Sequence, residues 1–226
     1  MRRFLSGAFV LGLTFAAATA FASTQFGSTF QMTYSAKKPN SSSGLETTMT
    51  WSDPGEPGGK PKALEKIEFR FHPGTKFDTK ALRVCKASNL ILRILGSAAC
   101  PASARVGWGS TQAIAGTVPI QTFVQFFNAK KQIIVVVNVE KRVLTVFRDD
   151  VRDGTIVVNL VVPQGTSLTG LHVQFFRHSR KVGRKRHTYM RTPPACPVNG
   201  TWTTSATFSY VDGTSEKLSS ATPCAR

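Results

Sequence analysis

Acidic residues are scarce in this chain of 226 residues, which has 12 Asp and Glu against 29 Lys and Arg and a net charge of +17. Charged residues make up 18% of the chain, below the roughly 25% of an average soluble domain. Sites that need several carboxylates in one loop, such as calcium sites, are therefore poorly supplied. The hydrophobic share of 41% is ordinary for a folded protein, which excludes a wholly disordered chain.

Closely spaced cysteine pairs are also missing. The four Cys are separated by at least 15 residues within each neighbouring pair, and no His lies beside any of them. Such spacing argues against a zinc site, whereas an even number of Cys in an exported chain predicts two disulfides. Three pairings exist, and we expect the neighbours in sequence to pair, Cys85 with Cys100 and Cys196 with Cys224. Oxidised Cys would leave no thiol nucleophile.

Long apolar runs are confined to the start of the chain. Residues 1–22 begin with Arg2 and Arg3, continue as an apolar stretch and end in the small-residue pattern AFA. This pattern is typical of a secretory signal peptide cut after Ala22, and the stretch is shorter than the roughly 20 residues that span a bilayer. We therefore expect a secreted or cell-envelope protein without a transmembrane segment. Residues 23–226 would form one domain with 27 basic and 12 acidic side chains.

Most of the remaining chain alternates apolar and polar residues, the pattern of antiparallel strands with one buried face. Phe30, Met32 and Tyr34 share one face. Later strands are expected at 45–51, 66–72, 117–127, 132–139, 143–148, 155–162 and 171–176. IIVVV at 133–137 is apolar on both faces, which predicts an interior strand. One short helix is expected at 89–95, capped by Ser88 and ended by Gly96. The prediction is an all-β fold, an antiparallel β-sandwich of jelly-roll type.

Two segments carry a resemblance to a known group of proteins. CPASARVGWGSTQA begins at Cys100, and CPVNGTWTTSATFSYVDG begins at Cys196 and precedes the last Cys. Their Cys, Pro and Gly spacing resembles that of uncharacterised secreted bacterial proteins, over about residues 69–224, although Trp108 stands where those proteins have a smaller residue. The resemblance implies a secreted β fold and no particular activity.

The most unusual segment is RHSRKVGRKRHTYMR at 177–191, which holds seven basic residues, two His and no acid. Strand patterns on both sides predict a hairpin with its tip near Gly183. Crowded like charges repel unless solvent or a polyanion screens them. The segment is either a solvated loop or a docking site for anionic envelope polymers or lipid head groups. The candidate anion-binding residues are Arg177, Arg180, Lys181, Arg184, Lys185, Arg186 and Arg191. No motif for sequence-specific nucleic-acid recognition accompanies them.

A catalytic constellation is not evident, and we predict a non-enzyme without cofactor or metal. Asp149, Asp150 and Asp153 alternate with Arg and Val in FRDDVRDGT, which is better explained by a surface turn than by a calcium loop. Glycosidase carboxylates need only meet in space, so a distant pair such as Glu68 and Glu140 stays open.

Carbohydrate binding is the main alternative function, because exposed aromatic rings can stack on sugars. Trp51 is expected in the core, whereas Trp202 is expected to be half exposed on a hairpin, and Trp108 is also available. Exposed coplanar rings would favour a carbohydrate site, and three buried rings would favour a structural role. A structural or accessory role without a ligand is the third reading.

Overall fold

The computed structural model describes residues 27–140, 142–152 and 154–225. The signal-peptide prediction for residues 1–22 lies outside these residues. The strands are β1 (Thr29–Tyr34), β2 (Leu45–Thr50), β3 (Leu64–Arg70), β4 (Lys76–Phe77), β5 (Arg105–Ala115), β6 (Val118–Ala129), β7 (Gln132–Val139), β8 (Arg142–Arg152), β9 (Thr155–Asn159), β10 (Thr166–Phe175), β11 (Ser179–Val182), β12 (Lys185–Thr188), β13 (Met190–Arg191), β14 (Thr201–Tyr210) and β15 (Ser215–Pro223). The α-helix α1 spans Asn89–Leu95.

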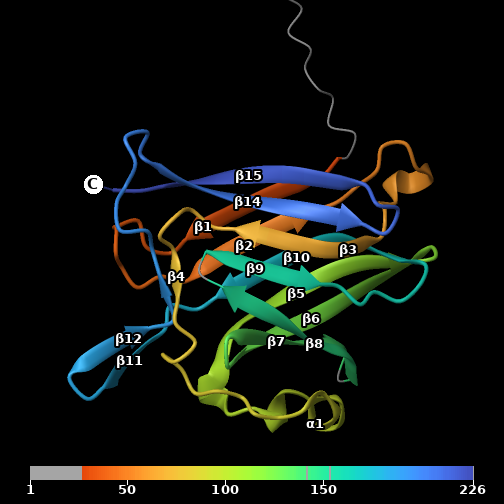
Figure 1. Ribbon diagram of the computed structural model, residues 1–226. Coiled ribbons are helices and arrows are strands. Elements are labelled where there is room, and N and C mark those ends of the chain that lie inside the picture. The colour runs from red at the N-terminus through yellow and green to blue at the C-terminus, as the bar shows by residue number, and fades with distance from the viewer. Residues whose placement is uncertain (1–26, 141, 153, 226) are drawn as a thin grey trace, which may run out of the picture.

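Eleven strands form one antiparallel sheet in the order β1-β2-β10-β5-β6-β7-β8-β9-β3-β14-β15. The sheet curls until its two edge strands lie side by side (Figure 1). Side chains of β15 join them, because Ser220 Oγ accepts from the Met32 N–H at 2.9 Å and Thr222 Oγ1 donates to the Met32 carbonyl at 2.9 Å. The predicted antiparallel all-β class is confirmed, and one continuous, nearly closed sheet supplies both faces around the core.

Alternation along each strand decides which side chains enter the curled sheet. In β1 every second residue is buried, and in β14 the buried positions are Trp202, Thr204, Ala206, Phe208 and Tyr210. Their neighbours in sequence face outward, as a strand repeat of two residues requires.

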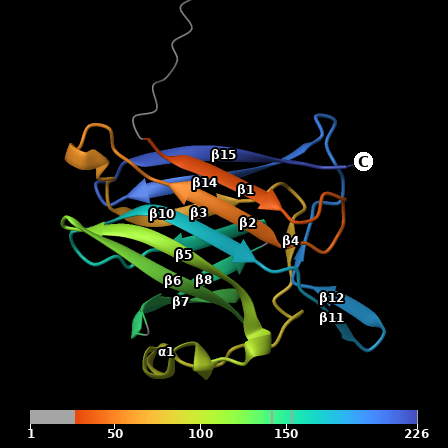
Figure 2. The same ribbon diagram turned by 180° about the vertical axis from the view of Figure 1, so that it is seen from behind.

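Strand β7 is covered on both faces, as its apolar sequence predicts. Its residues 133–136 are all buried. Ile134 and Val136 belong to an apolar cluster on the outer face of the sheet, together with Leu92 of α1. The helix therefore packs on the outside of β7 and β8 (Figure 2).

The short helix has the ends that its sequence predicts. Ser88 Oγ accepts from the Ile91 N–H at 3.3 Å, and Gly96 ends the helix with a φ of 59°. Arg148 on β8 fixes the helix to the sheet, because it donates to the Ala87 carbonyl at 2.6 Å and to Asn89 Oδ1 at 2.9 Å. In the described residues no helix is long and apolar enough to cross a membrane.

Both predicted disulfides are present. Cys85 pairs with Cys100 across the helical segment, with their Cα atoms 5.0 Å apart. Cys196 pairs with Cys224 at the open ends of the β14–β15 hairpin, with a Cα separation of 5.7 Å. Two closed disulfides are typical of proteins that fold in an oxidising compartment.

Candidate functional site

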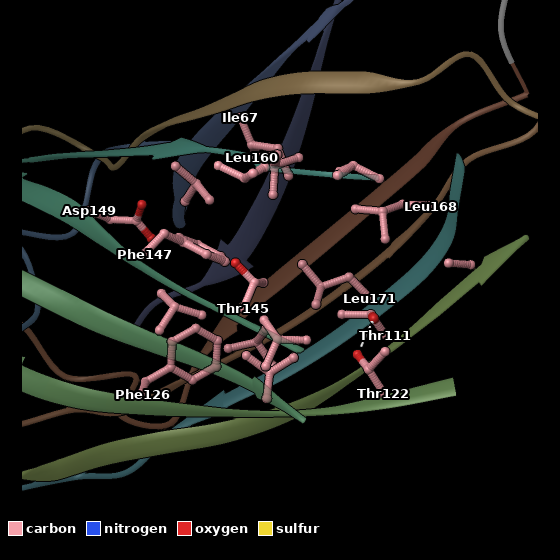
Figure 3. Close-up of a pocket in the computed structure, with 18 of the residues that line it drawn as sticks. Ile67, Thr111, Thr122, Phe126, Thr145, Phe147, Asp149, Leu160, Leu168 and Leu171 are labelled. Carbon is pink, nitrogen blue, oxygen red and sulfur yellow. Dashed lines mark hydrogen bonds between the residues drawn. The ribbon is translucent and has the colours of Figure 1, made fainter. Parts of the chain in front are cut away.

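The curled sheet encloses a cavity of about 850 Å³, a size typical of small-molecule sites. Strands β3 and β5–β10 supply most of its wall, and the side chains are almost all apolar (Figure 3). Thr111 and Thr122 are among the few polar lining groups, and their hydroxyls hydrogen-bond to each other at 2.6 Å. That pairing turns the two hydroxyls toward each other, and the wall around them is apolar.

Two strands that flank β6 in the sheet, β5 and β7, carry mostly small inward side chains, which leaves space inside the curled sheet. Strand β5 contributes Thr111, Ala113 and Ala115, and β7 contributes mainly valines. Around β14, by contrast, aromatic rings fill the interior. Trp202 contacts Tyr34 with ring centroids 5.5 Å apart, and both side chains are buried. One half of the sheet is thus filled and the other is hollow.

The VGWG segment shapes the hollow half. A Cβ atom on Gly107 would lie 2.2 Å from the Gln174 carbonyl oxygen, and one on Gly109 would lie 2.3 Å from the His172 carbonyl oxygen. The two glycines therefore allow β5 to approach β10 closely. Trp108 between them faces outward. This gives a physical reason for the glycine spacing in the CPASARVGWG segment.

The cavity is open where the β5–β6 turn, the β7–β8 turn and the β9–β10 connection meet. Its lining there includes the exposed residues Glu140, Arg142, Leu144 and Val161. Leu144 and Val161 are 51% and 69% exposed. Large exposed apolar side chains beside a cavity mark a contact region for apolar molecules.

Helix α1 extends this apolar rim. Arg93 of the helix lines a small recess with Leu144, Val161 and Pro163, so the helix reaches the same end of the sheet. Its side chains Leu90, Ile94 and Leu95 are each more than half exposed. The entrance is therefore bordered by apolar side chains of β8 and of the β9–β10 connection, and helix α1 lies beside it.

A single carboxyl group lies at the opposite, closed end. Asp149 of β8 is 2% exposed and lines the cavity. Figure 3 shows it at the far end from Leu168, Thr111 and Thr122. Burial is the main cause that raises the pKa of Asp149 to about 8; a backbone hydrogen bond from Asn159 lowers the pKa, and the neighbouring Asp150 raises it.

Asp149 corrects one sequence prediction. The FRDDVRDGT segment was expected to be a surface turn, yet β8 continues to Arg152 and carries Asp149 inside the sheet. Asp150 does face solvent, and Asp153 lies outside the described residues. The period-two register of β8 could have found this, because Thr145, Phe147 and Asp149 share one face.

The candidate glycosidase pair does not form one site. Glu68 Oε1 accepts from Arg70 Nε at 2.6 Å on the outward face of β3, whereas Glu140 lies at the cavity rim. Among the described residues no group of three His, Cys, Asp or Glu side chains could hold a metal ion.

The basic segment forms the predicted hairpin, β11 and β12, with Gly183 in the turn at a φ of 60°. It projects from the end of β10, away from the sheet (Figures 1 and 2). Lys181 lies opposite Arg186 in the register, so like charges face each other across the ribbon. Six of the seven candidate residues are exposed, namely Arg177, Arg180, Lys181, Arg184, Lys185 and Arg186.

The base of the hairpin is attached to the body. His187 Nδ1 lies 3.0 Å from Asp78 Oδ2, and Arg191 donates to the Asn40 carbonyl at 2.7 Å. Arg191 is half-buried, and this hydrogen bond holds its side chain at the base of the hairpin, apart from the exposed tip. Tyr189 is fully buried, so this ring contributes packing and is not available for stacking on a ligand.

The three Trp side chains are not equivalent. Trp51 is buried as expected, but Trp202 is fully buried, so the expectation that it is half exposed is wrong. It packs on Tyr34, and its Nε1 donates to the Ala195 carbonyl at 2.8 Å. Trp108 is 36% exposed and stacks on Phe123 with centroids 6.1 Å apart and an interplanar angle of 29°.

The functional feature that sequence reasoning missed is the cavity itself. The alternation of apolar and polar residues predicts which face of a strand is buried. It does not predict whether the inward side chains fill the space inside the curled sheet. No protein-family profile, curated protein or solved structure matches this chain.

Proposed function

We propose that this is a non-catalytic binding protein that holds an elongated apolar molecule inside the hollow half of its sheet. The observation that carries the proposal is the cavity of about 850 Å³ with an almost wholly apolar wall. Each Å² of apolar ligand surface that is buried there stabilises the complex by roughly 25 cal/mol. The apolar rim around Leu144 and Val161 supports entry of such a molecule at the open end.

The cellular setting belongs to the same proposal. The signal-peptide pattern and the two disulfides support a protein that acts outside the cytosol, free or at the cell envelope. A carrier there would protect an apolar molecule from water without changing it chemically.

Displacement of a fluorescent apolar probe tests the proposal. The double variant Ala113→Trp with Val137→Phe places bulk on two inward positions that line the cavity and should weaken probe binding at least tenfold. Gln112→Trp is the matched control, because Gln112 is exposed on the same strand. Equal probe affinity in the folded double variant and the wild type would contradict the proposal. Native mass spectrometry of the purified protein should also show a bound molecule that organic solvent extracts.

A second function rests on the hairpin. Its exposed cations, in a segment whose sequence contains no Asp or Glu, support docking onto anionic envelope polymers or lipid head groups. Because such binding is electrostatic, it should weaken as salt rises.

Retention on anionic vesicles or cell walls as a function of NaCl tests this second function. Replacing Arg180, Lys181, Arg184, Lys185 and Arg186 by Gln should abolish retention at low salt. The matched control removes five exposed charges that lie on other elements, on β3, β8, β15, α1 and the segment before α1, at Arg70, Lys86, Arg93, Arg152 and Lys217. Unchanged retention in the hairpin variant, or equal loss in the control, would overturn the docking role.

A further inference from the structure

The closed end of the cavity contains a carboxyl group whose hydrogen-bonding capacity is only partly satisfied by the fold. Asp149 follows Phe147 on the inward face of β8 and lies opposite Ile133 of β7 in the register. Apolar side chains form the surrounding wall, and the other charged lining residues, Glu140 and Arg142, lie at the open end. An acid at this position is costly to bury, so its presence calls for a partner.

The structure supplies a hydrogen-bond partner for only part of the Asp149 carboxyl group. The backbone N–H of Asn159 hydrogen-bonds to the carboxyl, but Asp149 Oδ1 has no hydrogen-bond partner among the described residues. Seven buried side-chain atoms of the described residues share that state, and Asp149 Oδ1 is the one that belongs to a lining residue of the cavity. Leaving such an atom unsatisfied costs roughly 1–3 kcal/mol, which a bound ligand would recover.

We propose that Asp149 Oδ1 binds the polar end of the ligand, so that the cavity selects aliphatic molecules that end in a hydrogen-bond donor, a hydroxyl or an ammonium group. This inference rests on the proposed apolar binding function and specifies the ligand class. The chain would lie along the apolar wall between the rim and Asp149. The donor at its buried end would complete the hydrogen bonds of the carboxyl group.

The same geometry disfavours an aliphatic carboxylate. Above pH 8, where the carboxyl of Asp149 is ionised, a fatty-acid anion would bring a second negative group beside it, and no cationic side chain lines the described closed end to offset that charge. At that pH an ammonium head would instead form a neutral pair with the ionised carboxyl, and a hydroxyl would donate to Oδ1. Selection therefore acts on the head group, while the chain contributes affinity.

Four probes with the same twelve-carbon chain test the inference at pH 9, above the pKa of about 8 of Asp149, each competing with the fluorescent probe below its solubility limit or its critical micelle concentration. They are dodecanol, its methyl ether, dodecylamine and dodecanoate. In the wild type, dodecanol should bind at least tenfold more tightly than its methyl ether, which has no donor, and dodecanoate should be weaker than dodecanol. In Asp149→Leu, which keeps similar bulk but removes the acceptor, the ratio of dodecanol to ether affinities should fall to about one.

Asp149→Asn separates the two donor classes, because it keeps an acceptor oxygen but removes the charge. If Asp149→Asn binds dodecylamine tenfold more weakly than the wild type does, with little change for dodecanol, the ammonium group is the preferred head. If Asp149→Asn and the wild type bind both probes with equal affinity, the hydroxyl is the preferred head. If no probe competes with wild type, the apolar binding function itself fails. If all four compete but Asp149→Leu leaves their ratios unchanged, the role of Asp149 is wrong and the carrier function stands.

Discussion

The two halves of the curled sheet solve the packing problem in opposite ways. Around β14 the inward residues include several aromatic rings, and Trp51 and Phe208 meet edge to face with centroids 5.4 Å apart. On β5 and β7 the inward residues are mostly Thr, Ala and Val, which are short and leave open space inside the sheet. One sheet therefore holds a solid core on one side and a cavity on the other, and the smaller inward side chains of β5 and β7 contribute to the difference.

The two halves also differ in how their structure is stabilised. The filled half holds the buried aromatic rings and the Cys196–Cys224 disulfide that joins the ends of β14 and β15. The hollow half is instead supported from outside, by α1, Arg148 and the Cys85–Cys100 disulfide. An outer layer compensates for packing that the inner face lacks.

The largest expected effect comes from truncating one residue in each half. Phe208 is fully buried in the filled half, so Phe208→Ala should lower the free energy of unfolding by about 3–5 kcal/mol, because a new cavity forms. Val137 already faces open space, and Val137→Ala should cost only about 1 kcal/mol. Chemical denaturation of both variants measures the difference. Equal losses would show that the hollow half is packed in solution.

The pH dependence of stability gives the next largest effect. The folded pKa of Asp149, about 8, lies above its ordinary value of 3.8. Its contribution to stability is therefore fully present below pH 3.8 and is lost as the pH rises toward 8, by about 1.4 kcal/mol per pH unit where one proton differs. Asp150 is the titratable neighbour that reinforces the shift, and Ile133 faces Asp149 from β7.

Asp149→Asn removes this titration. The variant should unfold at a higher temperature than the wild type at pH 8, and the gap should narrow toward pH 5. Thermal unfolding monitored by circular dichroism at several pH values measures it. A gap independent of pH would mean that Asp149 is solvated and ionised throughout.

Enlarging a small residue in each half reverses the first comparison. Ala206 is fully buried among aromatic residues, so Ala206→Leu should cost about 1–3 kcal/mol through overpacking. Ala113 faces the cavity, and Ala113→Leu should cost less than about 1 kcal/mol because the added methyl groups enter free space. Urea denaturation compares the two. A larger loss at Ala113 than at Ala206 would contradict the assignment of filled and hollow halves.

Local patterns in the sequence predict much of this architecture. Alternation places Phe30 and Met32 inside, the apolar run 133–137 predicts a strand covered on both faces, and Ser88 and Gly96 delimit the helix. The disulfide pairs follow from sequence proximity. These features depend on neighbours along the chain, so local physics is sufficient to predict them.

The cavity and the burial of Trp202 and Asp149 depend on distant residues. Trp202 is covered because Tyr34, 168 positions earlier, packs on it, and Asp149 is buried because β8 is an interior strand of a nearly closed sheet. Both were misjudged from their immediate sequence surroundings. Whether inward side chains meet depends on how far the sheet curls, and the period of two carries no information on curvature.

The smallest expected effect lies on the outer face of the hollow half. Trp108 stacks on Phe123 and its ring contacts His172 edge to face at 6.2 Å, all on the surface. Trp108→Ala should therefore change the free energy of unfolding by less than about 1 kcal/mol and leave binding of the apolar probe unchanged, because the cavity lies behind the sheet. A glycan array compares the variant with wild type for the carbohydrate alternative. Sugar binding that persists at high salt and disappears in Trp108→Ala would place a second ligand on this outer face, whereas loss of the apolar probe would show that the two faces of β5 are coupled.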